Sequence, residues 1–95
     1  MNTRRPSFMR AIAPPLMAAM RIVFEEFDEL NKEGKQIDPL LIDTLERLTF
    51  LMNELSRKGK RYLNSKQRED FEDCAFAGCD YMDVYEYIKK QQKNK

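Results

Sequence analysis

The side chains that most often do chemistry in proteins are scarce in this sequence. It contains no His, which is the commonest metal ligand and the usual proton carrier near neutral pH. Its two cysteines, Cys74 and Cys79, cannot complete a four-ligand zinc site without His. On one helix they would stand roughly 140° apart around the axis, so they cannot form a disulfide with each other. We therefore expect reduced thiols, a cytoplasmic location and no bound metal.

Serines and carboxylates give no stronger sign of catalysis. Ser7, Ser56 and Ser65 would each need a Lys or carboxylate as base, and helical spacing places none convincingly beside them. The 16 acidic residues are expected mainly on the polar faces of helices, where charged side chains are normally solvated. No glycine-rich loop that could hold a phosphate group is present. We expect a protein that is not an enzyme, with no catalytic residue and no cofactor.

The charges are sorted into blocks along the chain. The net charge is only +1, yet residues 1–24 contain four arginines and no acid, and residues 57–68 contain six cations and no acid. Mainly acidic blocks follow each of them, over 25–56 and 69–88. Because charge patterns set orientation and partner choice in binding, the two basic segments are the first candidates for a functional surface.

The basic segment 57–68 surrounds an aromatic residue, Tyr62, and predicts a protein-binding site. Arg and Tyr are frequent at the energetic centre of protein interfaces. The preceding apolar segment contains Phe50 and Leu51, which do not fit one buried stripe, and surplus apolar surface on a small domain indicates a partner. The expected partner-binding residues are Phe50, Leu51, Arg57, Lys58, Arg61 and Tyr62.

Two other interpretations of the same cations remain open. They could bind a nucleic-acid backbone, since cations interleaved with an aromatic residue suit phosphates. The residues of that interpretation are Arg4, Arg5, Lys60, Lys66 and Arg68. They could also serve only the fold, by pairing with acids of the following helix. The acids that follow Arg68 would repel phosphates, so we favour a protein partner, which includes a second copy of the chain, over nucleic acid.

Helical periodicity predicts the elements that position these residues. Apolar residues recur every three or four positions over 15–33, 39–58 and 65–90. In the second segment we expect a buried stripe centred on Leu48, made of Leu41, Leu45, Leu48, Met52 and Leu55. Short connections make the first two segments an antiparallel hairpin, with the long third helix packed across it. Composition and periodicity together predict an all-α protein, a small three-helix bundle. No segment has the 18 or so apolar residues of a membrane span, and we expect no membrane partner.

Proline and glycine set the expected boundaries. The pair Pro14-Pro15 should exclude helix before it and suit the first turn after it. Residues 1–13 are therefore expected to be a basic N-terminal arm, which folds on a partner or covers the bundle as an apolar lid. The helical domain is expected over 14–90, with a polar C-terminal tail at 91–95. Gly34 offers a left-handed cap to the first helix, and Asp38 is expected as the N-cap of the second.

One glycine, Gly78, lies in the middle of the third predicted helix. Glycine there costs about 1 kcal/mol relative to Ala, and such a glycine usually has a packing reason. We expect a close helix crossing, with a bulky side chain over the glycine. A functional groove or a kink is the alternative.

Overall fold

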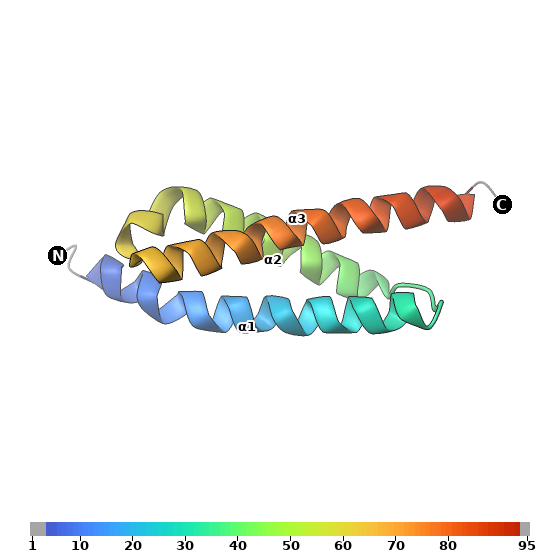
Figure 1. Ribbon diagram of the computed structural model, residues 1–95, viewed down its shortest axis with the longest axis horizontal. Coiled ribbons are helices and arrows are strands. Elements are labelled where there is room, and N and C mark those ends of the chain that lie inside the picture. Colours follow the sequence, from blue (N-terminus) through green and yellow to red (C-terminus); the bar gives the residue numbers. More distant parts are fainter. Residues whose placement is uncertain (1–3, 94–95) are drawn as a thin grey trace.

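Three long helices joined by short connections make up the computed structural model (Figure 1), which describes residues 4–93 and the side chains of residues 8–91. The elements are α1 (Arg4–Lys32), α2 (Pro39–Gly59), a short 3-10 turn η1 (Lys60–Tyr62) and α3 (Ser65–Lys93). α2 runs antiparallel to its two neighbours in an elongated molecule of 56 × 21 × 19 Å. The predicted all-α three-helix bundle is confirmed. Within residues 4–93, no helix is long and apolar enough to cross a bilayer.

The start of α1 differs from the prediction. The sequence predicts a helix from about residue 15, but α1 begins at Arg4 and runs through Pro14 and Pro15. Each proline removes one backbone hydrogen bond, to the carbonyl oxygen of Arg10 or Ala11. These two residues and both prolines are exposed, so water can replace the missing donors. The predicted helix start is wrong because the prolines lie on the solvent face, where the lost bonds cost least.

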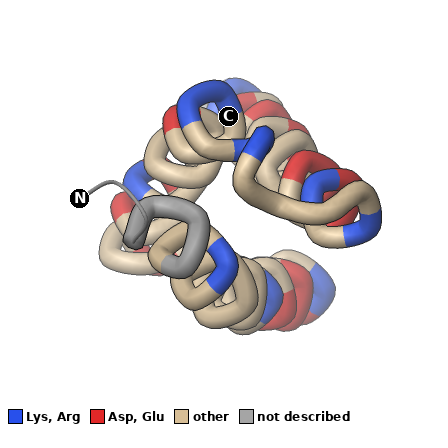
Figure 2. Tube along the Cα trace, turned by 90° about the vertical axis from the view of Figure 1, so that its left-hand side faces the viewer, with Lys and Arg blue, Asp and Glu red and all other residues tan. Residues whose placement is uncertain are grey.

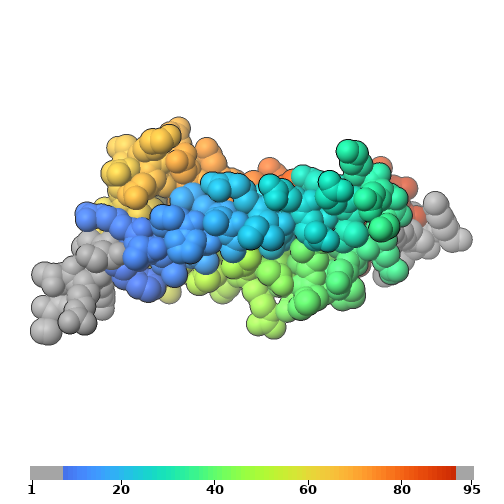
Figure 3. Space-filling view, turned by 90° about the horizontal axis from the view of Figure 1, so that it is seen from below, coloured from blue at the N-terminus to red at the C-terminus, as the bar shows by residue number. Residues whose placement is uncertain are grey.

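The described part of the expected arm therefore belongs to the bundle. Met9 and Ala13 are buried and extend the stripe of Met20, Val23 and Phe27 backwards at helical spacing. Figure 3 shows α1 lying along one face of the molecule, with α2 on one side of it and α3 on the other. Of the two alternatives for the arm, covering the bundle is what its residues 8–13 do.

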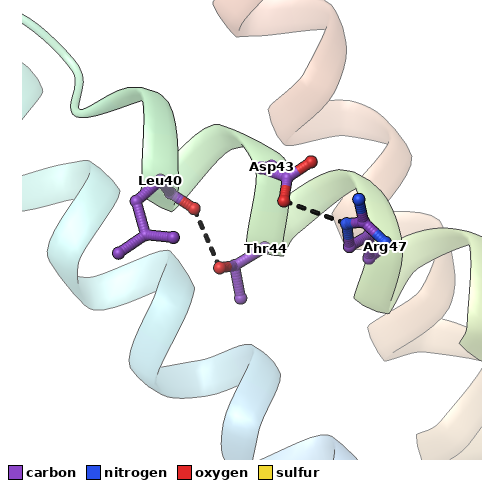
Figure 4. A network of polar contacts seen from close by, with 4 residues as sticks. All are labelled: Leu40, Asp43, Thr44 and Arg47. Carbon is purple, nitrogen blue, oxygen red and sulfur yellow. Dashed lines mark hydrogen bonds and ion pairs between the residues drawn. The ribbon is translucent and has the colours of Figure 1, made fainter.

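The N-terminus of α2 is built from local side-chain hydrogen bonds. Asp38 Oδ1 accepts from the backbone N–H of Leu40 at 2.9 Å, the N-cap that the sequence predicts. One turn later, Thr44 Oγ1 donates to the Leu40 carbonyl oxygen at 2.8 Å, and Arg47 Nε donates to Asp43 Oδ2 at 2.9 Å (Figure 4). At the other end of the preceding connection, Gly34 has φ +71° and caps α1 as expected.

The buried stripe of α2 is displaced from the one that leucine spacing predicts. Its buried residues are Leu45, Thr49, Met52, Ser56 and Gly59. Leu48, expected at the centre of the stripe, is only partly buried. The physical reason is that α2 lies between two helices, so Leu45 and Met52 share the buried face with small residues that let α1 and α3 approach closely. Leu41, Leu48 and Leu55 lie at the side of this face.

All three helices meet at Gly78. This residue is buried, and a Cβ placed on it would lie 2.6 Å from Met20 Cε and closer still to Thr49 Oγ1. Side chains from α1 and α2 thus fill the space that the glycine leaves. The predicted close crossing is confirmed.

Tyr81 ties the middle of α3 to α1. Its ring stacks on Phe24 with centroids 4.3 Å apart and meets the edge of Phe27 at 5.3 Å. Its hydroxyl donates to Asp28 Oδ2 at 2.8 Å. Desolvation first, and then this hydrogen bond and the Asp28 charge, raise the pKa of Tyr81 to about 12.

Candidate binding surface

The predicted partner-binding residues lie on two faces of α2. Phe50 and Arg57 line a shallow hollow that also includes Asn53, on the side of α2 that faces α3. Leu51 lies about 100° further round the helix axis, on the side that carries Lys58. Phe50 and Leu51 are 68% and 42% exposed, so both are on the surface, but the structure does not bring all six residues to one site.

A groove with an apolar floor lies where the beginning of α1 meets the end of α2. Its volume is about 290 Å³. Phe8, Leu55, Lys58, Arg61 and Tyr62 surround a floor made by Met9 and Gly59. We call it the α1/α2 groove. It unites three of the predicted residues, Lys58, Arg61 and Tyr62, with Phe8, which the sequence assigns only to the arm.

Phe8 lies beside the contact between Met9 and Gly59. A Cβ placed on Gly59 would lie 2.7 Å from Met9 Sδ, so the Met9 side chain occupies the space that the glycine leaves. With Met9 covering Gly59, its neighbour Phe8 remains 57% exposed at the edge of the groove. The signal in the sequence was the helical stripe through Met9 and Ala13, which places Phe8 next to a buried position.

Arg61 and Tyr62 hold each other at the rim of the groove. Arg61 Cζ lies 5.1 Å from the centroid of the Tyr62 ring, and its Nη2 donates to Tyr62 Oη at 3.1 Å. The ring is partly buried against the core. A cation over an aromatic face is attracted by the ring quadrupole, so the guanidinium has a preferred position before any partner arrives.

Most other cations of the basic segment have acidic partners. Ion pairs join Arg57 and Lys58 to Glu54, Lys60 to Glu72, and Lys66 to Asp70. Figure 2 shows the molecule from the left-hand end of Figure 1. In this view, segments with Lys or Arg (blue) lie close to segments with Asp or Glu (red) along the helices. This pairing favours the structural interpretation for these four cations. The side chains of Arg4 and Arg5 lie outside the described residues.

A second hollow lies on the other side of Tyr62. Its volume is about 520 Å³, and Arg10, Arg61, Tyr62, Leu63, Asn64 and Gln67 line it. We call it the arginine pocket. It joins an arginine of α1 to the connection between α2 and α3. In the described part of the chain, no carboxylate oxygen lies within 4.0 Å of either arginine.

Two exposed phenylalanines lie near the seam between α2 and α3. Asn53 Nδ2 donates across this seam to Cys79 Sγ at 3.7 Å. Phe50 precedes Asn53 by one helical turn and Phe76 precedes Cys79 by one turn, and because the two helices are antiparallel, the phenylalanines lie on opposite sides of this contact along the seam. Phe76 is 59% exposed, and the sequence did not single it out, because small residues surround it.

The cysteines are both free thiols. Cys79 is exposed, whereas Cys74 is partly buried, and burial raises the pKa of Cys74 against the opposing effect of Arg21. Among the described residues, no group of three or more Cys, Asp or Glu side chains is arranged to hold a metal ion.

No family model matches the chain, and no curated protein or solved structure matches it either.

Proposed function

We propose that this protein is a non-enzymatic interaction module, a small cytoplasmic regulator, adaptor or inhibitor that binds a segment of a partner protein in the α1/α2 groove. The observation that carries the proposal is the exposed ring of Phe8 beside Leu55 and Tyr62, with Lys58 and Arg61 at the rim. Aromatic side chains next to arginine are typical of the energetic centre of interfaces.

The chemistry of the groove indicates what the partner segment carries. Its apolar wall suits one large apolar side chain, and its cations suit acidic residues on either side of that anchor. Arg61 already rests on Tyr62, so binding would cost it little rotamer entropy. Lys58 makes only an exposed pair with Glu54 at 3.8 Å, and such a pair is readily exchanged for a partner carboxylate.

A selection from displayed random peptides tests this proposal directly. We expect the selected peptides to share one apolar anchor flanked by Asp or Glu. Phe8→Ala should weaken their binding about tenfold, since losing one anchor ring costs more than 1 kcal/mol. The matched control is Phe50→Ala, which removes a similarly exposed phenylalanine ring from α2, outside the groove.

Two results would count against the groove. Peptides that bind Phe8→Ala as well as the wild type would remove it as the site. Peptides that lose affinity with Phe50→Ala instead would move the binding surface to the seam between α2 and α3.

A further inference from the structure

The arginine pocket is lined by two arginines that are far apart in sequence. Arg10 comes from α1, and Arg61 from the turn η1. Lys60 and Lys66, which stand on either side of Arg61 in sequence, each have a carboxylate within 4.0 Å, from Glu72 and Asp70. Arg10, Arg61 and Arg68 have none among the described residues, and two of these three arginines line this hollow.

The amides of the pocket add further hydrogen-bond donors. Asn64 Oδ1 accepts from the backbone N–H of Gln67 at 2.8 Å, and Gln67 Oε1 accepts from the backbone N–H of Asn64 at 3.3 Å. Because this reciprocal cap occupies both side-chain oxygens, each residue keeps its amide NH₂ for other acceptors. Two guanidiniums and two amides then line a hollow without any acid.

We propose that the arginine pocket binds one phosphate group, carried by a phosphorylated residue of the partner segment in the α1/α2 groove. The identity of the carrier rests on the proposed function. Arg61 and Tyr62 line both hollows, so a phosphorylated residue would lie directly beside the apolar anchor. Two guanidiniums that bind the same phosphate would match a dianion in charge and in bidentate geometry.

The charge distribution favours a single phosphate over a nucleic-acid backbone. A polymer needs a continuous track of cations, but the neighbouring cations are paired with acids. Beyond the pocket, α3 continues with Glu69 and Asp70, which would repel the next phosphate. A volume of about 520 Å³ also leaves room for the residue that carries the phosphate.

Inorganic phosphate titrated into the isotope-labelled protein tests the pocket without any partner. We expect saturable NMR shifts of the side-chain amides of Asn64 and Gln67. Arg10→Gln and Arg61→Gln should each weaken binding about tenfold, the usual size of one charge-assisted contact. The matched control is Arg68→Gln, which loses the same charge one residue beyond Gln67 but outside the pocket, and it should change the affinity less than twofold.

Two results of the phosphate titration would overturn the inference. Shifts that grow linearly without saturation would mean that phosphate has no site here. An equal loss in the Arg68→Gln protein would mean that phosphate senses only the general field of the basic turn. Thermal melts followed by circular dichroism establish that each variant is folded before it is titrated.

Synthetic peptides then identify the carrier. A selected peptide with phosphoserine beside its anchor should bind about tenfold tighter than the unphosphorylated form, and Arg10→Gln should abolish that advantage. Phe8→Ala should weaken both forms equally. If phosphorylation does not tighten binding to the wild-type protein while Phe8→Ala still weakens it, this inference alone is overturned. If Phe8→Ala does not weaken binding, the proposed function is overturned. An oligonucleotide that binds tighter than the phosphopeptide would overturn the inference in favour of nucleic acid.

Discussion

At the scale of single residues, the fold depends on positions where atoms are missing. Gly78 and Gly59 leave spaces that Thr49, Met20 and Met9 fill. The hydroxyl of Thr49 is buried without a hydrogen-bond partner among the described residues. Such a group costs free energy, so close packing of the three helices at this point outweighs an unsatisfied oxygen.

Gly78→Ala is expected to destabilise the protein. Alanine gains about 1 kcal/mol in helix propensity, but its methyl group would overlap Thr49 and Met20, and overpacking of this kind costs about 1–3 kcal/mol. Urea unfolding should show a net loss of stability that Thr49→Ala in the same chain partly reverses. A Gly78→Ala protein more stable than the wild type would contradict the close crossing.

In an alkaline titration, the ionisation of Tyr81 should report on the contact between α1 and α3. Its pKa of about 12 lies above the ordinary value of 10.0, so the folded state holds the proton more tightly than the unfolded state. The stability from this contact is present below pH 10 and is lost as the pH rises towards 12. Tyrosinate absorbance should show a component near pH 12 that disappears in Tyr81→Phe, and Asp28→Asn should move it to lower pH.

At the scale of elements, the helical spacing of apolar residues continues through Pro14 and Pro15, where the local effect of proline predicts that a helix cannot continue. The three helices, the Asp38 cap and the Gly34 cap follow from the sequence. The first half of α1 does not, because a double proline normally ends a helix. Burial of Met9 and Ala13 outweighs two lost backbone hydrogen bonds on the solvent side, a tertiary effect that the local proline rule does not take into account.

A pair of neighbouring substitutions measures how firmly the beginning of α1 belongs to the bundle. Met9→Ala removes a buried side chain and should cost about 2–4 kcal/mol. Phe8→Ala removes an exposed one next to it and should stay within about 0.5 kcal/mol. Thermal or urea unfolding gives both values. Equal, small effects would place the first turns of α1 outside the cooperative unit.

The exposed apolar residues Phe50 and Leu51 of α2 are expected to contribute little to folding. Phe50→Ala combined with Leu51→Ala should leave the helical circular dichroism and the unfolding midpoint nearly unchanged, because both side chains are largely exposed. Peptides selected for the α1/α2 groove should bind the double variant as tightly as the wild type, because neither side chain lines that groove. An unfolded double variant would show that these side chains belong to the core.

At the scale of the whole molecule, blocks of charge in the sequence become pairs in space. The composition of each block was visible in the sequence, but the partners were not, because Lys60 meets Glu72 only through the packing of α2 against α3. For the same reason the predicted site was incomplete. Phe8 and Arg10 join the basic turn through the approach of α1 to Gly59, a contact between distant segments.

Binding to random duplex DNA should therefore be weak at about 150 mM salt. Six cations of the basic turn contacting phosphates would give a slope near −5 in log affinity against log salt, from about −0.9 per contact. Ion pairs already occupy four of these cations, so we expect a much shallower slope. Charge reversal at Lys60 and Arg61 is the companion measurement. Tight binding with the full slope would restore the nucleic-acid interpretation.

The backbone amides of α3 should differ in their protection from hydrogen exchange between the first part of the helix and the last turns. Ala75 and Gly78 are buried among the other helices, whereas no residue from 79 to 91 is buried, and the end of the helix extends away from α1 and α2 (Figure 1). Hydrogen exchange at Ala75 and Gly78 should require unfolding of the whole domain, while the last turns exchange through local fraying. Deuterium uptake along α3 should then rise steeply after Tyr81. The position of this rise marks the end of the part of α3 that unfolds together with the rest of the domain.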